Sequence, residues 1–217
     1  MRQGQGILLI TNALDAAAQA EFESWYIREH LPDRLGIPGF LRGRRYRSAT
    51  GAPRFMALYE TRTPEVLQSS AYLERLANPT PRTQRVMPSF RDMCRSVLRV
   101  AATQGSLDGG QLLLIDLSDA ANRADSLQAI TALLPGVVEA PGICAAHLWL
   151  MPDFTPTPSP EAKLRGAPDR SIPAALAVEA TDAVSLETIA ERISQQLAPA
   201  TFAGRQIYQF LCALSGG

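Results

Sequence analysis

Histidine and cysteine residues are few in this sequence, and nucleotide-binding motifs are missing. Three cysteines occur among the 217 residues, at Cys94, Cys144 and Cys212, each alone in an apolar segment. They are interpreted as small buried core residues in a reducing compartment, and no disulfide is expected. The two histidines, His30 and His147, are far apart, so no metal site is expected. A glycine-rich phosphate loop and a GxSxG elbow are both missing, which disfavours nucleotide cofactors and serine hydrolase chemistry. We therefore expect no cofactor.

The chain also lacks an excess of either charge and a long apolar run. Lys plus Arg and Asp plus Glu each number 21, so the net charge is zero. No long-range field attracts nucleic acid or an anionic membrane, and neither partner is expected. The apolar run at 7–10 is too short for a signal peptide or a membrane span. These features indicate a cytoplasmic globular protein.

What the chain does contain is a repeat. Strands are predicted at 7–10, 40–47, 57–60 and 95–100, and again at 112–115, 143–150, 176–179 and 206–214; helices are predicted over 17–35 and 124–134 and after Thr63 and Thr181. The order in each half is β, α, β, β, α, β. It predicts an α+β fold, in which two tandem ferredoxin-like units, 1–104 and 105–217, form an intrachain α+β barrel around a shared apolar pocket. The composition of 104–110 is typical of a flexible linker.

The two halves differ by an insertion. Glu60 and Glu179 are farther apart in sequence than the matching pair Gly39 and Gly142. The extra residues are placed at 151–169, where five prolines stand. Such a composition predicts a semi-rigid exposed loop. A lid over a site and a loop without function both remain open.

The segment 22–33 carries the candidate catalytic residues Tyr26, Glu29 and His30. Imidazole suits proton transfer near pH 7, and a nearby carboxylate could orient it and raise its pKa. Trp25 lies one turn away. The alternative is that His30 only ends a helix, which is expected to stop before Pro32, where the dipole favours a cation.

The second strands differ between the halves. Alternation places Arg44 and Tyr46 on one side of the first, and His147 takes the place of Arg44 in the second. These residues could bind a substrate, Arg44 through an acidic group. Alternatively His147 is a structural residue, and the arginines are solvated or pair with acids such as Glu60. Tyr59 is interpreted as a pocket wall or a core aromatic.

The pattern Trp25-Tyr26-x-x-Glu29-His30-Leu31-Pro32, followed by 37–40 and 44–46, resembles the EthD-like branch of the dimeric α+β barrel superfamily. The match covers the first half well, while the second half is only a faint copy. The resemblance implies a ferredoxin-like repeat with a pocket between helix and sheet, and it favours Glu29 and His30 as the site. Members of the superfamily include cofactor-free monooxygenases, lactone isomerases, polyketide cyclases and haem-handling enzymes, so the fold alone does not choose the chemistry.

Three functions follow as hypotheses. The first is a cofactor-independent enzyme, of isomerase, cyclase or monooxygenase type, acting on a small hydrophobic or aromatic molecule with His30 as acid or base. Tyr26 and Tyr59 would orient a substrate oxygen, and Trp25 and Phe40 would form apolar walls. The second is a non-catalytic protein that binds such a molecule, and the third is a haem-binding protein that uses a histidine as axial ligand. A monomer or a homodimer is expected.

Overall fold

The computed structural model describes residues 4–48, 51, 54–197 and 202–216. The strands are β1 (Gly6–Leu14), β2 (Phe40–Arg47), β3 (Phe55–Thr61), β4 (Phe90–Gly105), β5 (Gln111–Asp116), β6 (Ile143–Leu150), β7 (Ala174–Ala180) and β8 (Gly204–Ser215). The α-helices are α1 (Gln19–Trp25), α2 (Leu31–Leu35), α3 (Ser70–Ala77), α4 (Pro81–Val86), α5 (Ala124–Val138), α6 (Ala162–Arg165) and α7 (Ala183–Gln196). Shorter helical turns are η1 (Ala16–Ala18), η2 (Tyr26–His30), η3 (Pro64–Gln68) and η4 (Met87–Ser89).

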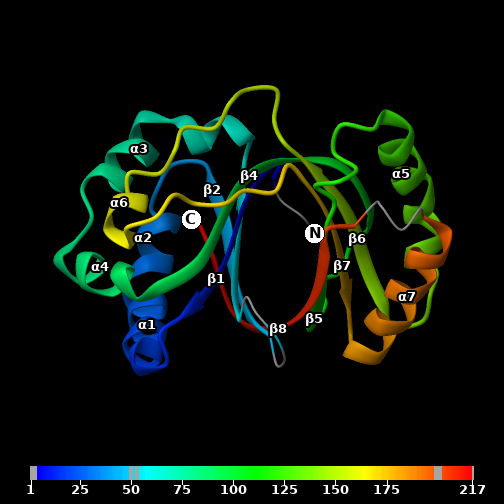
Figure 1. Cartoon of the computed structure of the whole chain (residues 1–217), viewed down its shortest axis with the longest axis horizontal. Helices are drawn as coiled ribbons and strands as arrows, with labels where there is room; N and C mark the ends of the chain where they lie inside the picture. The colour runs from blue at the N-terminus through cyan, green and yellow to red at the C-terminus, as the bar shows by residue number, and fades with distance from the viewer. Residues whose placement is uncertain (1–3, 49–50, 52–53, 198–201, 217) are drawn as a thin grey trace.

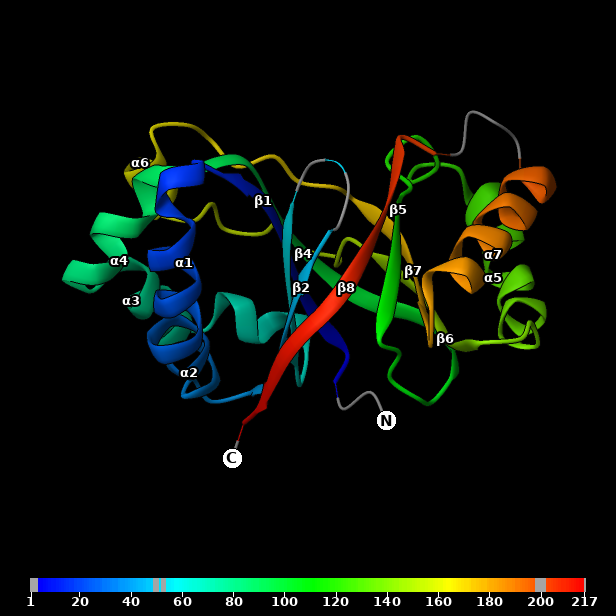
Figure 2. The same ribbon diagram turned by 90° about the horizontal axis from the view of Figure 1, so that it is seen from below.

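The strands of the described residues form one closed antiparallel barrel in the order β1-β3-β2-β8-β5-β7-β6-β4. The first four strands of the chain are neighbours as β4-β1-β3-β2, and the last four as β8-β5-β7-β6. Pairing of β2 with β8 and of β4 with β6 joins the two sets. The long strand β8 crosses between the halves in Figure 2. Closure leaves neither sheet an open edge, which removes the usual site of strand-to-strand aggregation.

Helices cover the outer face of the barrel at both ends of the long axis of the molecule (Figure 1). The helices α1 to α4 and α6 lie on one side, and α5 and α7 on the other. Alternation along the strands supplies both layers. In β1, for example, Leu8 and Ile10 belong to the core under the first helices, whereas Ile7 and Leu9 belong to the core inside the barrel.

The helical segment predicted over 17–35 is observed, but it runs through Pro32, so the expectation that it stops before that proline was wrong. The turn η2 is a π-helix, in which the amide of Leu31 donates to the carbonyl of Tyr26. Pro32 then stands in the first turn of α2, where its missing N–H needs no partner. His30 therefore lies within a helical segment that continues to Leu35, not at the end of a helix.

Side chains of the described residues fill the barrel interior, where the sequence predicted a shared apolar pocket. Large buried residues such as Tyr46, Leu58, Trp149 and Tyr208 occupy it, as expected for an eight-stranded barrel, whose interior is only wide enough for its own side chains. The interior also holds charge. The Arg44 guanidinium is buried there among acidic side chains.

The stretch predicted to be a flexible linker is held in place. Strand β4 continues through Gly105, and the next residues contact the barrel. Asp108 accepts from Arg44 at 3.2 Å, and the Gly109 amide donates to Glu179 at 3.0 Å. The cysteine interpretation also needs correction, because only Cys94 is buried while Cys144 and Cys212 are half-buried. Within the described ranges, no helix is long and apolar enough to span a membrane.

The proline-rich segment (residues 151–169) leaves the second half and crosses to the helices of the first (Figure 1). It contains the short helix α6 and is not simply an exposed loop. Phe154 and Leu164 pack against the core of the first half, and Ser159 and Glu161 are buried. The prolines keep the segment irregular, while these four side chains fix it on the molecule.

Candidate functional site

The imidazole of His30 lies between aromatic rings in the first half. Its ring centroid is 4.3 Å from that of Trp25 and 4.9 Å from that of Tyr26. The five-residue turn η2 brings His30 back over both residues, a geometry that π-turns often give to functional side chains. Trp25 is fixed in turn, because its indole N–H donates to the Thr83 hydroxyl at 3.1 Å.

His30 is buried and neutral at pH 7. Burial lowers its pKa well below the ordinary value of 6.5, and the positive charges of Arg34 and Arg45 lower it further. The expectation that a carboxylate raises this pKa was therefore wrong. Glu29 points elsewhere: it accepts from the Thr80 hydroxyl and lies 4.0 Å from Arg82. No described residue hydrogen-bonds the imidazole of His30.

Two tyrosines adjoin this group on its sheet side. The Tyr59 hydroxyl donates to that of Tyr26 at 3.3 Å. Burial raises the pKa of both phenols, so both are uncharged at pH 7. The Arg45 guanidinium lies 4.1 Å from the Tyr26 ring centroid and forms a 2.6 Å ion pair with Glu23. Phe40 packs nearby, with its ring centroid 5.9 Å from that of Tyr59.

The cavity beside His30 lies among η2, α2 and the connection between α3 and α4, and the proline-rich segment contributes Glu161 to its lining. Its lining includes His30, Arg34 and Glu161, and it has room for about 10 Å³, which is about one water molecule. Glu161 forms a 2.7 Å ion pair with Arg34, and both side chains are at least nine-tenths buried. Asp33 is a second partner of Arg34, at 3.2 Å. Arg34, one helical turn beyond His30, is therefore already paired with a carboxylate from the second half.

The other predicted binding residues lie on the opposite face of the sheet. Arg44, Tyr46 and His147 point into the barrel and share no cavity with His30. Arg44 binds both oxygens of Glu179, at 2.9 and 3.1 Å, and lies 3.4 Å from Glu60. The predicted pairing with Glu60 is confirmed.

His147 belongs to the same buried cluster. Its Nε2 is 3.5 Å from Glu179, and its Nδ1 is 3.1 Å from the Thr103 hydroxyl. Burial alone would raise the pKa of Glu179, but the hydrogen bond with His147 and the ion pair with Arg44 lower it well below its ordinary value. The charged side chains of this cluster already bind one another, and these bonds join the two halves. The cluster is therefore poorly suited to bind a ligand.

Sequence reasoning missed four residues of the His30 cavity and of the layer between sheet and helices. These are Arg34, Tyr72, Arg95 and Glu161. Arg34 stands four residues after His30 on the same helical face, a signal that was available in the sequence. Arg95 stands two residues before Val97 on β4, so both side chains face the helices. This could also have been predicted from the sequence. Nothing in the sequence pairs Glu161 with Arg34, because the contact crosses between the halves.

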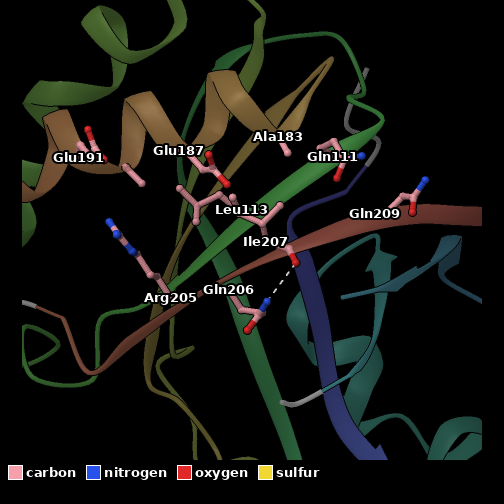
Figure 3. A pocket seen from close by; sticks show the side chains of 10 residues that line it. Gln111, Leu113, Ala183, Glu187, Glu191, Arg205, Gln206, Ile207 and Gln209 are labelled. Atoms are coloured by element: carbon pink, nitrogen blue, oxygen red, sulfur yellow. Dashed lines mark hydrogen bonds between the residues drawn. The ribbon is translucent and has the colours of Figure 1, made fainter. Parts of the chain in front are cut away.

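A larger space lies between β4 and the proline-rich segment. This cavity of about 460 Å³ is lined by Arg95 and Val97 of the strand and by residues 151–172 opposite. Another groove, of about 690 Å³, runs between α7 and strands β5 and β8 (Figure 3). Its charged lining side chains, Glu187, Glu191 and Arg205, are exposed to solvent, where water and salt screen them. The cavity under the proline-rich segment is therefore the better candidate for a ligand.

Neither histidine fits haem. Haem needs an open axial nitrogen and a pocket of at least a few hundred cubic ångströms. The cavity at His30 holds about one water. Both nitrogens of His147 face protein partners inside the barrel.

Comparisons with known proteins place the fold and leave the family open. No protein-family model matches the chain, and no curated protein matches it. Among solved structures, an anthrone oxidase-like protein is 12% identical, with 99% of this chain and 94% of that one covered and a TM-score of 0.65. A haem-binding protein from Thermus thermophilus is 12% identical, with coverage of 96% and 92% and a TM-score of 0.53. A mutant chlorite dismutase from Candidatus Nitrospira defluvii is 10% identical, with coverage of 98% and 92% and a TM-score of 0.54. The chain shares the α+β fold of these proteins.

Proposed function

We propose that this chain is a cofactor-independent enzyme that acts on a small, mainly apolar, aromatic molecule, with His30 as the group that accepts a proton. One observation carries the proposal. The imidazole is buried and neutral, it has no hydrogen-bond partner among the described residues, and it lines a small cavity together with the ion pair of Arg34 and Glu161. An imidazole nitrogen that no protein group binds is available to a water or a ligand in this cavity.

The charges around His30 suit the removal of a proton from a substrate. The transfer turns a neutral acid into an anion and leaves the imidazole positively charged. Arg34 and Arg45, whose charges disfavour an imidazolium when the site is empty, would stabilise the substrate anion that forms beside it. The uncharged phenols of Tyr26 and Tyr59 would hydrogen-bond a substrate oxygen, and Trp25 and Phe40 would form the apolar walls.

Access requires the proline-rich segment to move. Glu161 lines the His30 cavity and binds Arg34, while its neighbours Ser159 and Ala162 line the larger cavity under the segment. We propose that this segment is a lid, and that withdrawal of Glu161 exposes Arg34 and His30 together. Besides the ion pair of Glu161, the Gln68 amide donates to the Thr155 carbonyl at 3.1 Å, and Phe154 and Leu164 pack on the first core.

We further propose that the barrel is a tandem duplication of a ferredoxin-like unit of the EthD-like type, divided near residue 104. The strand order is the same in the two halves. Gly39 and Gly142, which match in the repeat, both have positive φ, at +93° and +78°. A left-handed residue at one repeat position in both halves supports common descent of the two turns. A cytoplasmic monomer or homodimer with a small-molecule partner completes the proposal.

Anthrone is a suitable first probe. It is a flat, mainly apolar carbon acid, and one structural neighbour is described as anthrone oxidase-like. Loss of a proton from anthrone gives an anion that molecular oxygen oxidises, with anthraquinone and water as the balanced products. Oxygen uptake and the ultraviolet spectrum would both follow the reaction.

The proposal predicts that the wild type accelerates anthrone consumption and that His30→Gln loses the acceleration. Arg28→Gln is the matched control, because Arg28 lies in the same turn but is exposed. Equal rates for the wild type and His30→Gln would contradict the role of His30.

A second candidate, a non-catalytic protein that binds the same kind of molecule, is favoured by the small volume beside His30. A cavity of about one water admits no substrate unless the lid opens. This candidate predicts that aromatic acids bind in the larger cavity, that no probe is turned over, and that His30→Gln leaves binding unchanged.

A further inference from the structure

The cavity under the proline-rich segment is lined by an arginine, Arg95, for which the described residues provide no direct ion pair. Arg95 is half-buried on β4 and donates to the Tyr72 hydroxyl at 3.1 Å. Within the part of the chain that the structure describes, no carboxylate forms an ion pair with it. Asp169 lines the same cavity, but it forms a 2.5 Å ion pair with Arg165. Asp169 and Glu161 lie close enough to stabilise the positive charge of Arg95 electrostatically, but neither forms a direct ion pair with it.

The direction of this side chain follows from the register of the sheet. Arg95 pairs with Ile10 of β1, which belongs to the core on the helix side. Arg95 therefore projects between the sheet and the helices, the same layer in which His30 lies. Its guanidinium carbon is 5.8 Å from the Tyr72 ring centroid, and that of Arg34 is 5.9 Å from the same ring. Tyr72 thus connects the arginine of the His30 cavity to the arginine of the larger one.

The rest of the lining combines apolar side chains with the hydroxyl groups of serines and threonines. Val97 and Ile172 belong to the sheet side, and Pro156, Pro158 and Pro168 come from the segment opposite. The volume of about 460 Å³ is within the range of small-molecule sites, which runs from about 300 to 1,000 Å³. An aromatic ring would fit between strand and prolines, and a guanidinium at the edge would bind a carboxylate through two parallel hydrogen bonds.

We propose that this cavity binds a small, flat, aromatic molecule with one carboxylate group, and that Arg95 binds the carboxylate. The inference deepens the proposed function and rests on it for one point, namely that the bound molecule is the substrate. Its acid group would be fixed at Arg95, and its other end would reach His30 once Glu161 leaves Arg34. Arg95 then makes acidic aromatic molecules bind more tightly than neutral ones, whereas neutral anthrone tests only the proton transfer at His30.

The test compares 2-naphthoate with 2-naphthamide, which has the same shape and no charge, by isothermal titration calorimetry at pH 7.5. The wild type should bind naphthoate about tenfold more tightly than naphthamide, the difference expected for one charge-assisted hydrogen-bonded pair. Arg95→Gln should bind both probes equally. Arg91→Gln, which alters an exposed arginine of the same strand, should keep the preference.

Two further variants separate the contributions. Tyr72→Phe removes the hydroxyl that accepts from Arg95 but keeps the cation, so the preference for naphthoate should persist. His30→Gln should also keep it while losing anthrone turnover.

Equal binding of the two probes by the wild type would overturn the inference, and that comparison needs no variant to fold. A preference that survives in Arg95→Gln, or disappears in Tyr72→Phe, would also overturn it. If the preference depends on Arg95 while anthrone turnover does not depend on His30, the binding site stands and the proposed chemistry fails.

Discussion

Replacing His30 with glutamine should make the protein less sensitive to acid. In the folded wild type the imidazole stays neutral, because burial first, and then Arg34 and Arg45, lower its pKa well below 6.5. The unfolded chain binds the proton with a pKa near 6.5. Between these two values the unfolded state holds more protons than the folded state, so stability falls as the pH falls through this window. Above about pH 6.5 neither state is protonated and the effect vanishes.

The size of the effect follows from this difference in protonation. Lowering the pH from 7.5 to 5.5 should decrease the free energy of unfolding of the wild type by about 1.4 kcal/mol more than that of His30→Gln. Urea unfolding followed by far-ultraviolet circular dichroism at the two pH values measures both quantities. All other titrating groups are shared by the two proteins and cancel in the difference. Arg28→Gln should behave as the wild type.

An equal loss of stability in the wild type and in His30→Gln would refute the reasoning. It would mean that the imidazole is already protonated in the folded protein at pH 5.5, or that water reaches it freely. Either outcome removes the neutral, enclosed proton acceptor on which the proposed function depends. A greater loss in His30→Gln than in the wild type would mean that folding raises the pKa of the imidazole instead of lowering it.

Three other results are expected. Glu179→Gln should lower the free energy of unfolding, measured in urea at pH 7.5, by about 3 kcal/mol, because it leaves Arg44 buried with weaker partners. The control Glu187→Gln, at an exposed position, should change it by less than about 0.5 kcal/mol. Similar values for the two variants would contradict the buried ion pair. Glu161→Ala should speed trypsin cleavage after Lys163 about tenfold with the circular dichroism spectrum unchanged, since the lid loses its ion pair; an unchanged rate would show that other contacts hold it. Haemin added to the protein should give no Soret shift, and a shifted band would show that one histidine becomes accessible.

Strand positions were predictable because they depend on local patterns. The predicted ranges 40–47 and 143–150 are β2 and β6 as observed, and the element order in each half follows from the repeat. Helix ends were less predictable. The helix α5 runs through Pro135 to Val138, beyond the predicted end at residue 134. After the π-turn at His30, the helical segment likewise continues through Pro32. In both cases the tertiary packing of the helix overrides the local preference of proline.

The site was only partly predictable, for physical reasons that differ among residues. The contact of His30 with Tyr26 follows from helical spacing and is observed. The direction of the pKa shift of His30 depends on burial and on Arg45, which arrives from a distant strand. The ion pair between Arg34 and Glu161 joins residues 127 positions apart. Such contacts between the halves follow only from the closed barrel, which no local pattern specifies.

The segregation of the candidate binding residues was also hidden in the sequence. Alternation correctly put Arg44 and Tyr46 on one side of β2. It does not say which side faces the helices, and that side turned out to carry Arg45 instead. A shift of one residue in register would exchange the two sets. The sequence therefore named residues from two separate environments as one site.

A crystal structure of the wild type with 2-naphthoate tests the central claim most directly, namely that one site for an aromatic acid extends from Arg95 to His30 under the proline-rich segment. We expect the carboxylate within hydrogen-bond distance of Arg95, the rings against Val97, and Glu161 withdrawn from Arg34. Naphthoate bound instead in the groove between α7 and β8, with the ion pair of Glu161 intact, would contradict the claim.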